Sequence, residues 1–376
     1  MVNLDIVRSS NAKLVQEQPL VAVFVGGTSG IGEYSLRALA ATVAKSHGKG
    51  LRAYIVGRNK NAAETIISDC INVYPDGQFR FIAATDLSLL KDVDRVCTEI
   101  LKAEEEASTP AGQARIDFLV LTQGYLTFSF EGMLVPFCGF TCQSNHDKPD
   151  TKEGLDAVMS LMYYSRMRFI IQLLPLLLKS SMPAHIVSVV NPNLEGKLNP
   201  NDLALRKPGS IGVSSFGSHT AHMNSLFMEQ LAVHHSERLA LIHLYPGFVK
   251  TNIGANAKFP KWLVWIWIYL FEPLFSSIFV PNEECGERVV FLASPRYPAH
   301  SIERSDDDAN RNDGAEVAVS PDGTIGGGFY RVNWNGNSIA ARKAQKVARK
   351  GDIPEKVWEH TMNVFKVIES GGKLTG

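Results

Sequence analysis

The sequence has few cysteines: five in 376 residues, an odd and sparse set. Small secreted domains held by disulfides carry a dense, even set, so that class is excluded and a reducing compartment is expected. The stretch MVNLDIVRSSN contains an acid at Asp5 and no apolar run, and no Asn-x-Ser/Thr sequence occurs anywhere. We therefore expect no signal peptide and a cytoplasmic protein.

An excess of charge of either sign is also lacking, because 38 Lys and Arg residues balance 38 Asp and Glu residues. Attraction to nucleic acid needs a surplus of basic side chains, so no nucleic-acid partner is expected. The remaining composition, 45% hydrophobic with 30 glycines, is typical of a globular protein.

Short apolar runs alternate with helical stretches along most of the chain. This alternation predicts an α/β fold, a doubly wound parallel sheet of the Rossmann type. Strands are predicted at 20–25, 52–56, 79–83, 116–121, 184–190 and 239–244, and the main helices at 34–44, 152–179 and 218–234.

The same pattern divides the chain into three parts. Residues 1–17 form an N-terminal arm, 18–294 the Rossmann-type domain, and 295–376 a C-terminal extension that packs on the same domain. Within the extension, a loop at 295–322, a strand at 329–334 and helices at 339–349 and 356–368 are predicted.

A glycine-rich turn joins the first strand to the first predicted helix. Gly26, Gly30 and Gly32 follow the spacing Gly-x-x-x-Gly-x-Gly, which allows a tight turn and close approach of a pyrophosphate to the helix N-terminus. The turn predicts a dinucleotide site that also includes Thr28, Ser29 and Ile31.

The end of the second strand indicates which dinucleotide is bound. An acid there accepts from a ribose 2′-hydroxyl, whereas a guanidinium pairs with a 2′-phosphate. Arg58 and Asn59 stand at this point and no acid lies within 54–60, which favours NADP(H). Asp86 and Leu87, after the third strand, are expected beside the adenine.

Four further segments carry a resemblance to a known family. Together with the glycine turn and Asp86, the sequences LVLTQG at 119–124 and YPGFVKT at 245–251 resemble the short-chain dehydrogenase/reductases. YYSRMRF at 163–169 and VWEHT at 357–361 resemble a divergent branch common among metabolic enzymes of filamentous fungi.

The resemblance implies further cofactor contacts and a role in specialised metabolism. Gln123 and Gly124 replace the end of the family's Asn-Asn-Ala-Gly turn. The residues implied to hold the nicotinamide carboxamide are Pro246, Gly247, Val249 and Thr251.

The family's proton-transfer residues are missing. Its chemistry uses a Tyr as general acid/base with a Lys four residues later, but none of the ten tyrosines here has such a lysine. Gly217 and Ala221 occupy the two positions, and the asparagine expected on the preceding helix falls near Met162.

Besides water, two side-chain substitutes are open as the proton source. One is Ser218 with His222, a hydroxyl/imidazole pair one turn apart. The other is Tyr164 with Arg168, although residues 161–169 also read as core or as a homodimer interface. Asn191 stands where the family's serine is expected after the fifth strand; its amide can hydrogen-bond a substrate carbonyl but is no proton donor of useful pKa.

A long apolar segment lies after the sixth predicted strand. Ten consecutive apolar residues at 262–271 and a further run at 274–280 are too short to span a bilayer, which needs about 20. A lid at 259–281 over an apolar substrate is one interpretation, and peripheral membrane contact through 262–280 is the other. Cys138, Cys142 and His146 are followed by no second ligand pair, so no metal site is expected.

The sequence thus favours an NADP(H)-dependent oxidoreductase of the short-chain type that acts on an apolar carbonyl or alcohol, with an atypical proton-transfer set. The missing Tyr and Lys leave two alternatives: a non-redox isomerase, cyclase or dehydratase on the same scaffold, or an inactive binding homologue.

Overall fold

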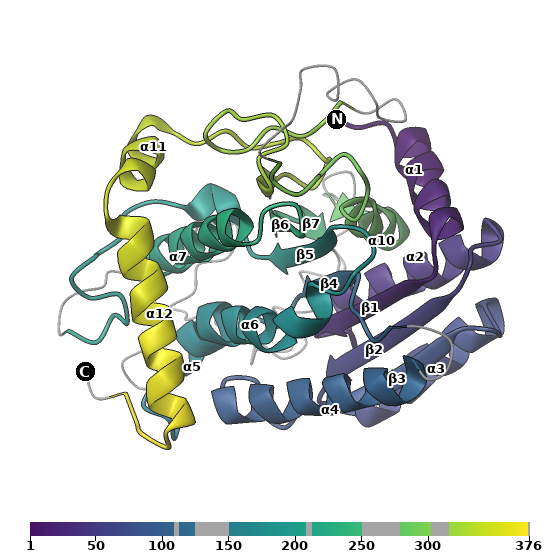
Figure 1. The fold of residues 1–376 in the computed structure, drawn as a ribbon, viewed down its shortest axis with the longest axis horizontal. Coiled ribbons are helices and arrows are strands. Elements are labelled where there is room, and N and C mark those ends of the chain that lie inside the picture. Colours follow the sequence, from purple (N-terminus) through teal and green to yellow (C-terminus); the bar gives the residue numbers. More distant parts are fainter. Residues whose placement is uncertain (109–112, 125–149, 208–212, 250–278, 302–315, 375–376) are drawn as a thin grey trace, which may run out of the picture.

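The computed structural model describes residues 1–108, 113–124, 150–207, 213–249, 279–301 and 316–374. Its centre is a sheet of seven parallel strands in the order β3-β2-β1-β4-β5-β6-β9, which confirms the doubly wound fold (Figure 1). The strands are β1 (Leu20–Val25), β2 (Leu51–Gly57), β3 (Gln78–Ala83), β4 (Phe118–Leu121), β5 (Ala184–Val189), β6 (Leu239–Leu244) and β9 (Phe329–Val332).

The inner strands are apolar along their length because helices cover both faces of the sheet. Every residue of β1, β4 and β6 is buried, whereas β3, at the edge, is mostly exposed or half-buried. The chain order reverses between β1 and β4, and ligands of such sheets bind at this switch point, beyond the carboxyl ends of the strands.

Two layers of helices enclose the sheet, and each shares a hydrophobic core with one face. The first layer contains α1 (Leu4–Glu17), α2 (Gly30–Lys45), α3 (Lys60–Val73) and α10 (Asn282–Phe291); the second contains α4 (Leu90–Ser108), α6 (Ser165–Leu177), α7 (Val213–His234) and α12 (Ile353–Glu369). The sequence did not indicate α1, a helix capped by Asn3 that buries Val7, Leu14 and Val15.

The single helix predicted at 152–179 is divided in the structure. A short α5 (Ala157–Met159) leads into a π-helical turn, η2 (Ser160–Tyr164), and only then into α6. Such turns widen a helix locally and are frequent at functional sites. The region that carries Met162 and Tyr164 is therefore not regular α-helix.

The C-terminal part of the chain completes the sheet. Strand β9 pairs with β6, and α12 packs on α7 through the rings of Trp358 and Phe227, stacked 4.7 Å apart. In the chain, α11 (Lys343–Lys350) comes between β9 and α12. Strands β7 (Phe248–Val249) and β8 (Phe279–Val280) form a separate two-stranded sheet. Within the described ranges no helix is long and apolar enough to cross a membrane.

Several predictions fall outside the described residues. They concern Thr251, nearly all of the lid at 259–281 and of the segment 262–280, and the group Cys138, Cys142 and His146. In the part of the chain that is described, no group of three or more His, Cys, Asp or Glu side chains is arranged to hold a metal ion.

Candidate functional site

The glycine turn lies at the switch point of the sheet, between β1 and α2. Gly26 has a φ of +82°, and a Cβ on it would lie 2.5 Å from the Thr122 Oγ1. A Cβ on Gly32 would lie 2.7 Å from the Gly26 carbonyl oxygen. Only glycine therefore allows the start of α2 to pack this closely against the turn and the end of β4.

The first turn of α2 has no side-chain cap. Ser29 is the N-cap residue, yet its side chain makes no capping hydrogen bond. The first backbone N–H groups of a helix have no intrahelical partner and attract anions. Thr28 packs against Gly57 at the end of β2, and Ile31 is half-buried, so both lie where the sequence analysis expected a dinucleotide.

Arg58 follows β2 directly and is exposed. It makes no hydrogen bond or ion pair with any described residue, so its guanidinium is available to a ligand. The neighbouring Asn59 has a structural task, because its Oδ1 accepts from the Ala62 N–H at 3.1 Å and caps α3.

The residues after β3 are held by a local turn. The Asp86 Oδ1 accepts from both the backbone N–H and the hydroxyl of Ser88, while Asp92 accepts from the Asp86 N–H at 2.8 Å. Leu87 is buried in the core shared by the sheet and α4. These hydrogen bonds hold the exposed Asp86 side chain in a defined turn.

Gln123 and Gly124, after β4, lie against the glycine turn and against Arg166 of α6. The Arg166 guanidinium donates to the carbonyl oxygens of Leu121 and Gln123 and to the Ser188 hydroxyl. Sequence reasoning missed Arg166. Its signal was a basic residue in a mostly apolar helix that also carries Arg168.

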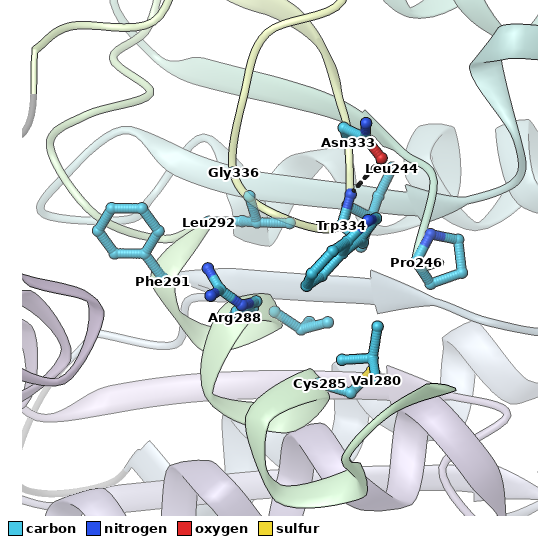
Figure 2. Close-up of a pocket in the computed structure, with 11 residues that line it drawn as sticks. Leu244, Pro246, Val280, Cys285, Arg288, Phe291, Leu292, Asn333, Trp334 and Gly336 are labelled. Atoms are coloured by element: carbon cyan, nitrogen blue, oxygen red, sulfur yellow. Dashed lines mark hydrogen bonds between the residues drawn. The ribbon is translucent and has the colours of Figure 1, made fainter. Parts of the chain in front are cut away.

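The segment after β6 packs on the C-terminal part of the chain (Figure 2). Gly247 has a φ of +75°, and a Cβ on it would lie 3.0 Å from the Trp334 ring. A small, mostly apolar cavity beneath is lined by Pro246, Val280 and Trp334, among others. Of the described residues expected to hold a carboxamide, Val249 lies in β7, whereas Pro246 and Gly247 precede that strand.

On α7, Ser218 and His222 both lie against Gly196, in the loop after β5. The His222 Nδ1 is 2.9 Å from the Gly196 carbonyl oxygen, so this nitrogen carries the proton and donates. Burial lowers the pKa of His222, and its Nε2 has no partner among the described residues. At neutral pH His222 therefore offers one unprotonated nitrogen.

Tyr164 and Arg168 do not form the pair considered in the sequence analysis. The Tyr164 hydroxyl is 2.8 Å from the His360 Nε2, and burial raises the pKa of the phenol well above its usual value. Arg168 instead pairs with Asp94 at 2.6 Å and with Glu369 at 2.7 Å. The aromatic residues of this segment are buried in the protein's own core.

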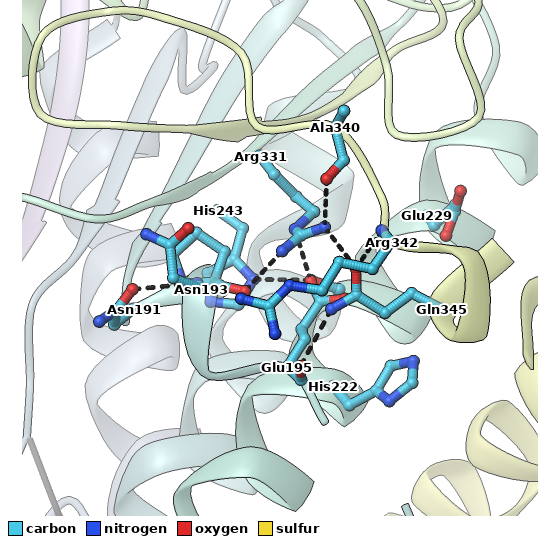
Figure 3. Close-up of polar contacts among 12 residues, drawn as sticks. Asn191, Asn193, Glu195, His222, Glu229, His243, Arg331, Ala340, Arg342 and Gln345 are labelled. Carbon is cyan, nitrogen blue, oxygen red and sulfur yellow. Dashed lines mark hydrogen bonds and ion pairs between the residues drawn. The ribbon is translucent and has the colours of Figure 1, made fainter. Parts of the chain in front are cut away.

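Asn191 caps a short 3₁₀ turn, η3 (Pro192–Leu194), where its Oδ1 accepts from the Asn193 N–H at 3.0 Å. Figure 3 shows that this turn leads into a buried network around Glu195. The Glu195 carboxylate is fully buried; it forms an ion pair with Arg331 at 2.8 Å and with Arg349 at 3.2 Å. The C-terminal part of the chain thereby fixes the loop that follows β5.

One polar residue on each of three neighbouring strands supports this network. Ser188 of β5 stands beside His243 of β6, which stands beside Arg331 of β9. The His243 Nδ1 donates to Ser225 at 2.7 Å, and Ser225 donates to Glu195. Burial, with the charge of Arg331, lowers the pKa of His243 well below its usual value. The sequence signal was the presence of polar residues within three mostly apolar strands.

The parallel sheet, its switch point and the glycine turn define an α/β protein of the Rossmann class. No family model matches the chain. It is 37% identical over 370 residues, 98% of each chain, to a Stachybotrys chartarum protein named short-chain dehydrogenase/reductase SAT2.

Two further curated relatives agree. Oxidoreductase AN1596 of Emericella nidulans is 36% identical over 366 residues, 97% of this chain and 98% of the relative. Oxidoreductase andH of Emericella variicolor is 31% identical over 373 residues, 98% of each. The chain belongs to the short-chain dehydrogenase/reductase family, and it is an oxidoreductase of that type.

Proposed function

We propose that this protein transfers hydride between NADP(H) and an apolar carbonyl or alcohol in specialised metabolism. The observation that carries the choice of cofactor is Arg58, an exposed guanidinium at the end of β2 with no partner in the described ranges and no acid within 54–60. The names of the relatives favour redox chemistry over the isomerase, cyclase, dehydratase and binding alternatives.

The residues present fit a dinucleotide. Gly26 and Gly32 clear the start of α2, and a Cβ on Gly124 would meet nothing nearer than the Met162 Sδ at 3.5 Å, so the backbone there is accessible. When bound, the cofactor supplies or accepts the hydride. We expect it to be held by Gly26, Thr28, Ser29, Gly30, Ile31, Gly32, Arg58, Asn59, Asp86, Leu87, Gln123, Gly124, Pro246, Gly247, Val249 and Thr251.

His222 is the side chain best suited to move the proton. Its Nδ1–H is engaged by Gly196, which leaves Nε2 as a base for an alcohol proton, and Ser218 lies beside the same glycine as a relay. Tyr164 is less suited because its hydroxyl is bonded to His360 in the core. Asn191 holds the turn that precedes Gly196, so we assign it a positioning role.

The experiment is a fluorescence titration of the purified protein with NADPH and NADH, followed by NADPH consumption assays with a panel of apolar ketones. We expect tighter binding of NADPH and turnover of at least one ketone. Failure to bind either dinucleotide would overturn the proposal, and binding without turnover of any substrate would support the binding alternative instead.

A further inference from the structure

The guanidinium of Arg166 is buried, and no described residue is its charge partner. It is 1% exposed, and its three hydrogen-bond acceptors are two carbonyl oxygens and one hydroxyl. No carboxylate in the described part of the chain pairs with it, and its Nε has no partner there. Burial lowers the pKa of Arg166 to about 9, so the group is still protonated at neutral pH. A buried, unneutralised cation is costly and calls for a compensating anion.

Arg168, two residues further along α6, shows the ordinary arrangement. It is also buried, but its charge is neutralised by Asp94 and Glu369. Buried arginines elsewhere in the described ranges follow the same rule, as Arg331 does with Glu195. Arg166 is therefore an exception within its own helix.

Gln123 is a second incomplete group, directly beside the first. Its side chain is 6% exposed, yet neither its Oε1 nor its Nε2 has a partner among the described residues. A buried carboxamide normally makes several hydrogen bonds. The Gln123 carbonyl oxygen accepts from Arg166, so the two incomplete groups are linked.

Both groups lie at the glycine turn. The Gln123 backbone nitrogen is 3.1 Å from the place that a Cβ on Gly26 would take. A Cβ on Gly124 would be 3.9 Å from an Arg166 terminal nitrogen, with nothing nearer than 3.5 Å. The Arg166 guanidinium and the backbone of Gln123 thus lie beside the switch point of the sheet, where a ligand of this fold binds.

We propose that Gln123 and Arg166 form an anion-recognition element on the β4 side of the glycine turn, and that they bind a phosphate-bearing part of the dinucleotide. The Gln123 amide donates a hydrogen bond to the phosphate of the ligand. The positive charge of Arg166 offsets the negative charge of that phosphate, because the two are separated by a short distance in a medium of low dielectric constant. The inference rests on the proposed function; it adds Arg166 of α6 to the determinants of affinity and gives the Gln123 side chain a specific role in binding phosphate. It also gives a role to Gln123, which stands where the family's Asn-Asn-Ala-Gly turn has alanine.

The test is a calorimetric titration of Gln123→Ala, Arg166→Met and Arg166→Lys with NADPH. We expect Gln123→Ala to weaken NADPH about tenfold and Arg166→Met about 30- to 100-fold, with a smaller loss for Arg166→Lys, which keeps the charge. Adenosine, which carries no phosphate, should bind every variant with the same affinity as the wild type. Arg166→Met should also reduce the salt dependence of NADPH binding.

Arg168→Lys and Gln172→Ala are the matched controls, since both residues contact Asp94 instead of the turn. They should change the thermal midpoint of the free protein without changing NADPH affinity. If Arg166→Met does not fold, Gln123→Ala decides the matter alone. Wild-type NADPH affinity in Gln123→Ala, or in Arg166→Met if that variant folds, would overturn the inference, whereas absence of NADPH binding in the wild type would instead overturn the proposed function.

Discussion

The hydroxyl of Tyr164 lies 2.8 Å from the Nε2 of His360, a residue 196 positions later in the chain. This bond joins the π-helical turn after α5 to α12. The bond engages the buried Tyr164 hydroxyl and the Nε2 of the half-buried His360 with each other, so neither of these two atoms is open to a substrate. It also makes the packing of α12 sensitive to the protonation of His360.

Acid should loosen this contact. Burial, together with the charge of His219, lowers the pKa of His360 to about 4, against about 6.5 in an unfolded chain. The unfolded state therefore binds more protons between these values, and stability present above pH 6.5 is lost as the pH falls through 4. We expect His360→Asn to reduce the loss of unfolding free energy between pH 7 and 4.5 by about 1–3 kcal/mol in urea titrations. The exposed His47→Asn is the control, and identical pH profiles for all three proteins would contradict the assignment.

The buried carboxylate of Glu195 predicts a large stability effect. Glu195→Gln leaves Arg331 without a carboxylate among the described residues, and such a change costs about 3–5 kcal/mol. Urea unfolding and limited proteolysis near α11 would measure it, since Arg349 of α11 also loses this partner. Asp352→Asn, which breaks an exposed pair with Lys356, should leave the unfolding free energy nearly unchanged.

The glycine turn predicts a loss of both stability and ligand binding. Gly26→Ala combines a positive φ with a Cβ 2.5 Å from Thr122, so we expect about 1–3 kcal/mol of destabilisation and little NADPH binding. Gly323→Ala separates the two causes, because Gly323 has a φ of +104° and no atom within 4 Å of an added Cβ. Equal effects at the two sites would show that backbone strain alone matters.

His222 predicts a pH profile for turnover. Because burial lowers its pKa, the rate of alcohol oxidation should rise with pH below the ordinary histidine range and level off before neutrality. His222→Gln should lower kcat about 10²- to 10⁴-fold and abolish this rise. His219→Gln removes a neighbouring imidazole bonded to Leu203 and should alter stability while leaving the profile intact. A wild-type profile in His222→Gln would exclude it as the base.

Arg58 predicts the cofactor preference. Arg58→Asp removes the guanidinium expected to pair with the 2′-phosphate, so NADPH affinity should fall about 100-fold or more while NADH is affected little. Arg80→Ala changes an exposed arginine on the adjacent strand and should leave both affinities as they are. Equal losses of NADPH and NADH in Arg58→Asp would refute the role in phosphate recognition.

The strands and the glycine turn could be predicted from the sequence because their signals are local. The runs at 20–25 and 239–244 coincide with β1 and β6 to the residue, since buried strands of a parallel sheet are apolar without interruption. The helix α1 could not be found in this way, because its buried side chains are few and are spread among polar ones. Its stability comes from packing against α2 and α10.

The sequence also singled out His222, Ser218 and Tyr164 as candidates, but their spacing could not tell which of them are open to a ligand. Tyr164 and His222 are both buried, yet Tyr164 is bonded to His360 while the His222 Nε2 has no partner among the described residues. Hydrogen-bond partners of this kind come from distant parts of the chain. Local sequence patterns therefore do not reveal which partner a side chain has.

By itself, then, the sequence determined the doubly wound sheet, its glycine turn and the lack of the family's Tyr and Lys, because each is a matter of residue type at short spacing. The few cysteines and the balanced charge excluded other classes of protein in the same way. Only the tertiary structure decided which charges are neutralised. Among the described residues, Arg168 has carboxylate partners and Arg166 has none, although only two positions separate them, because pairing depends on whether the facing elements supply a carboxylate.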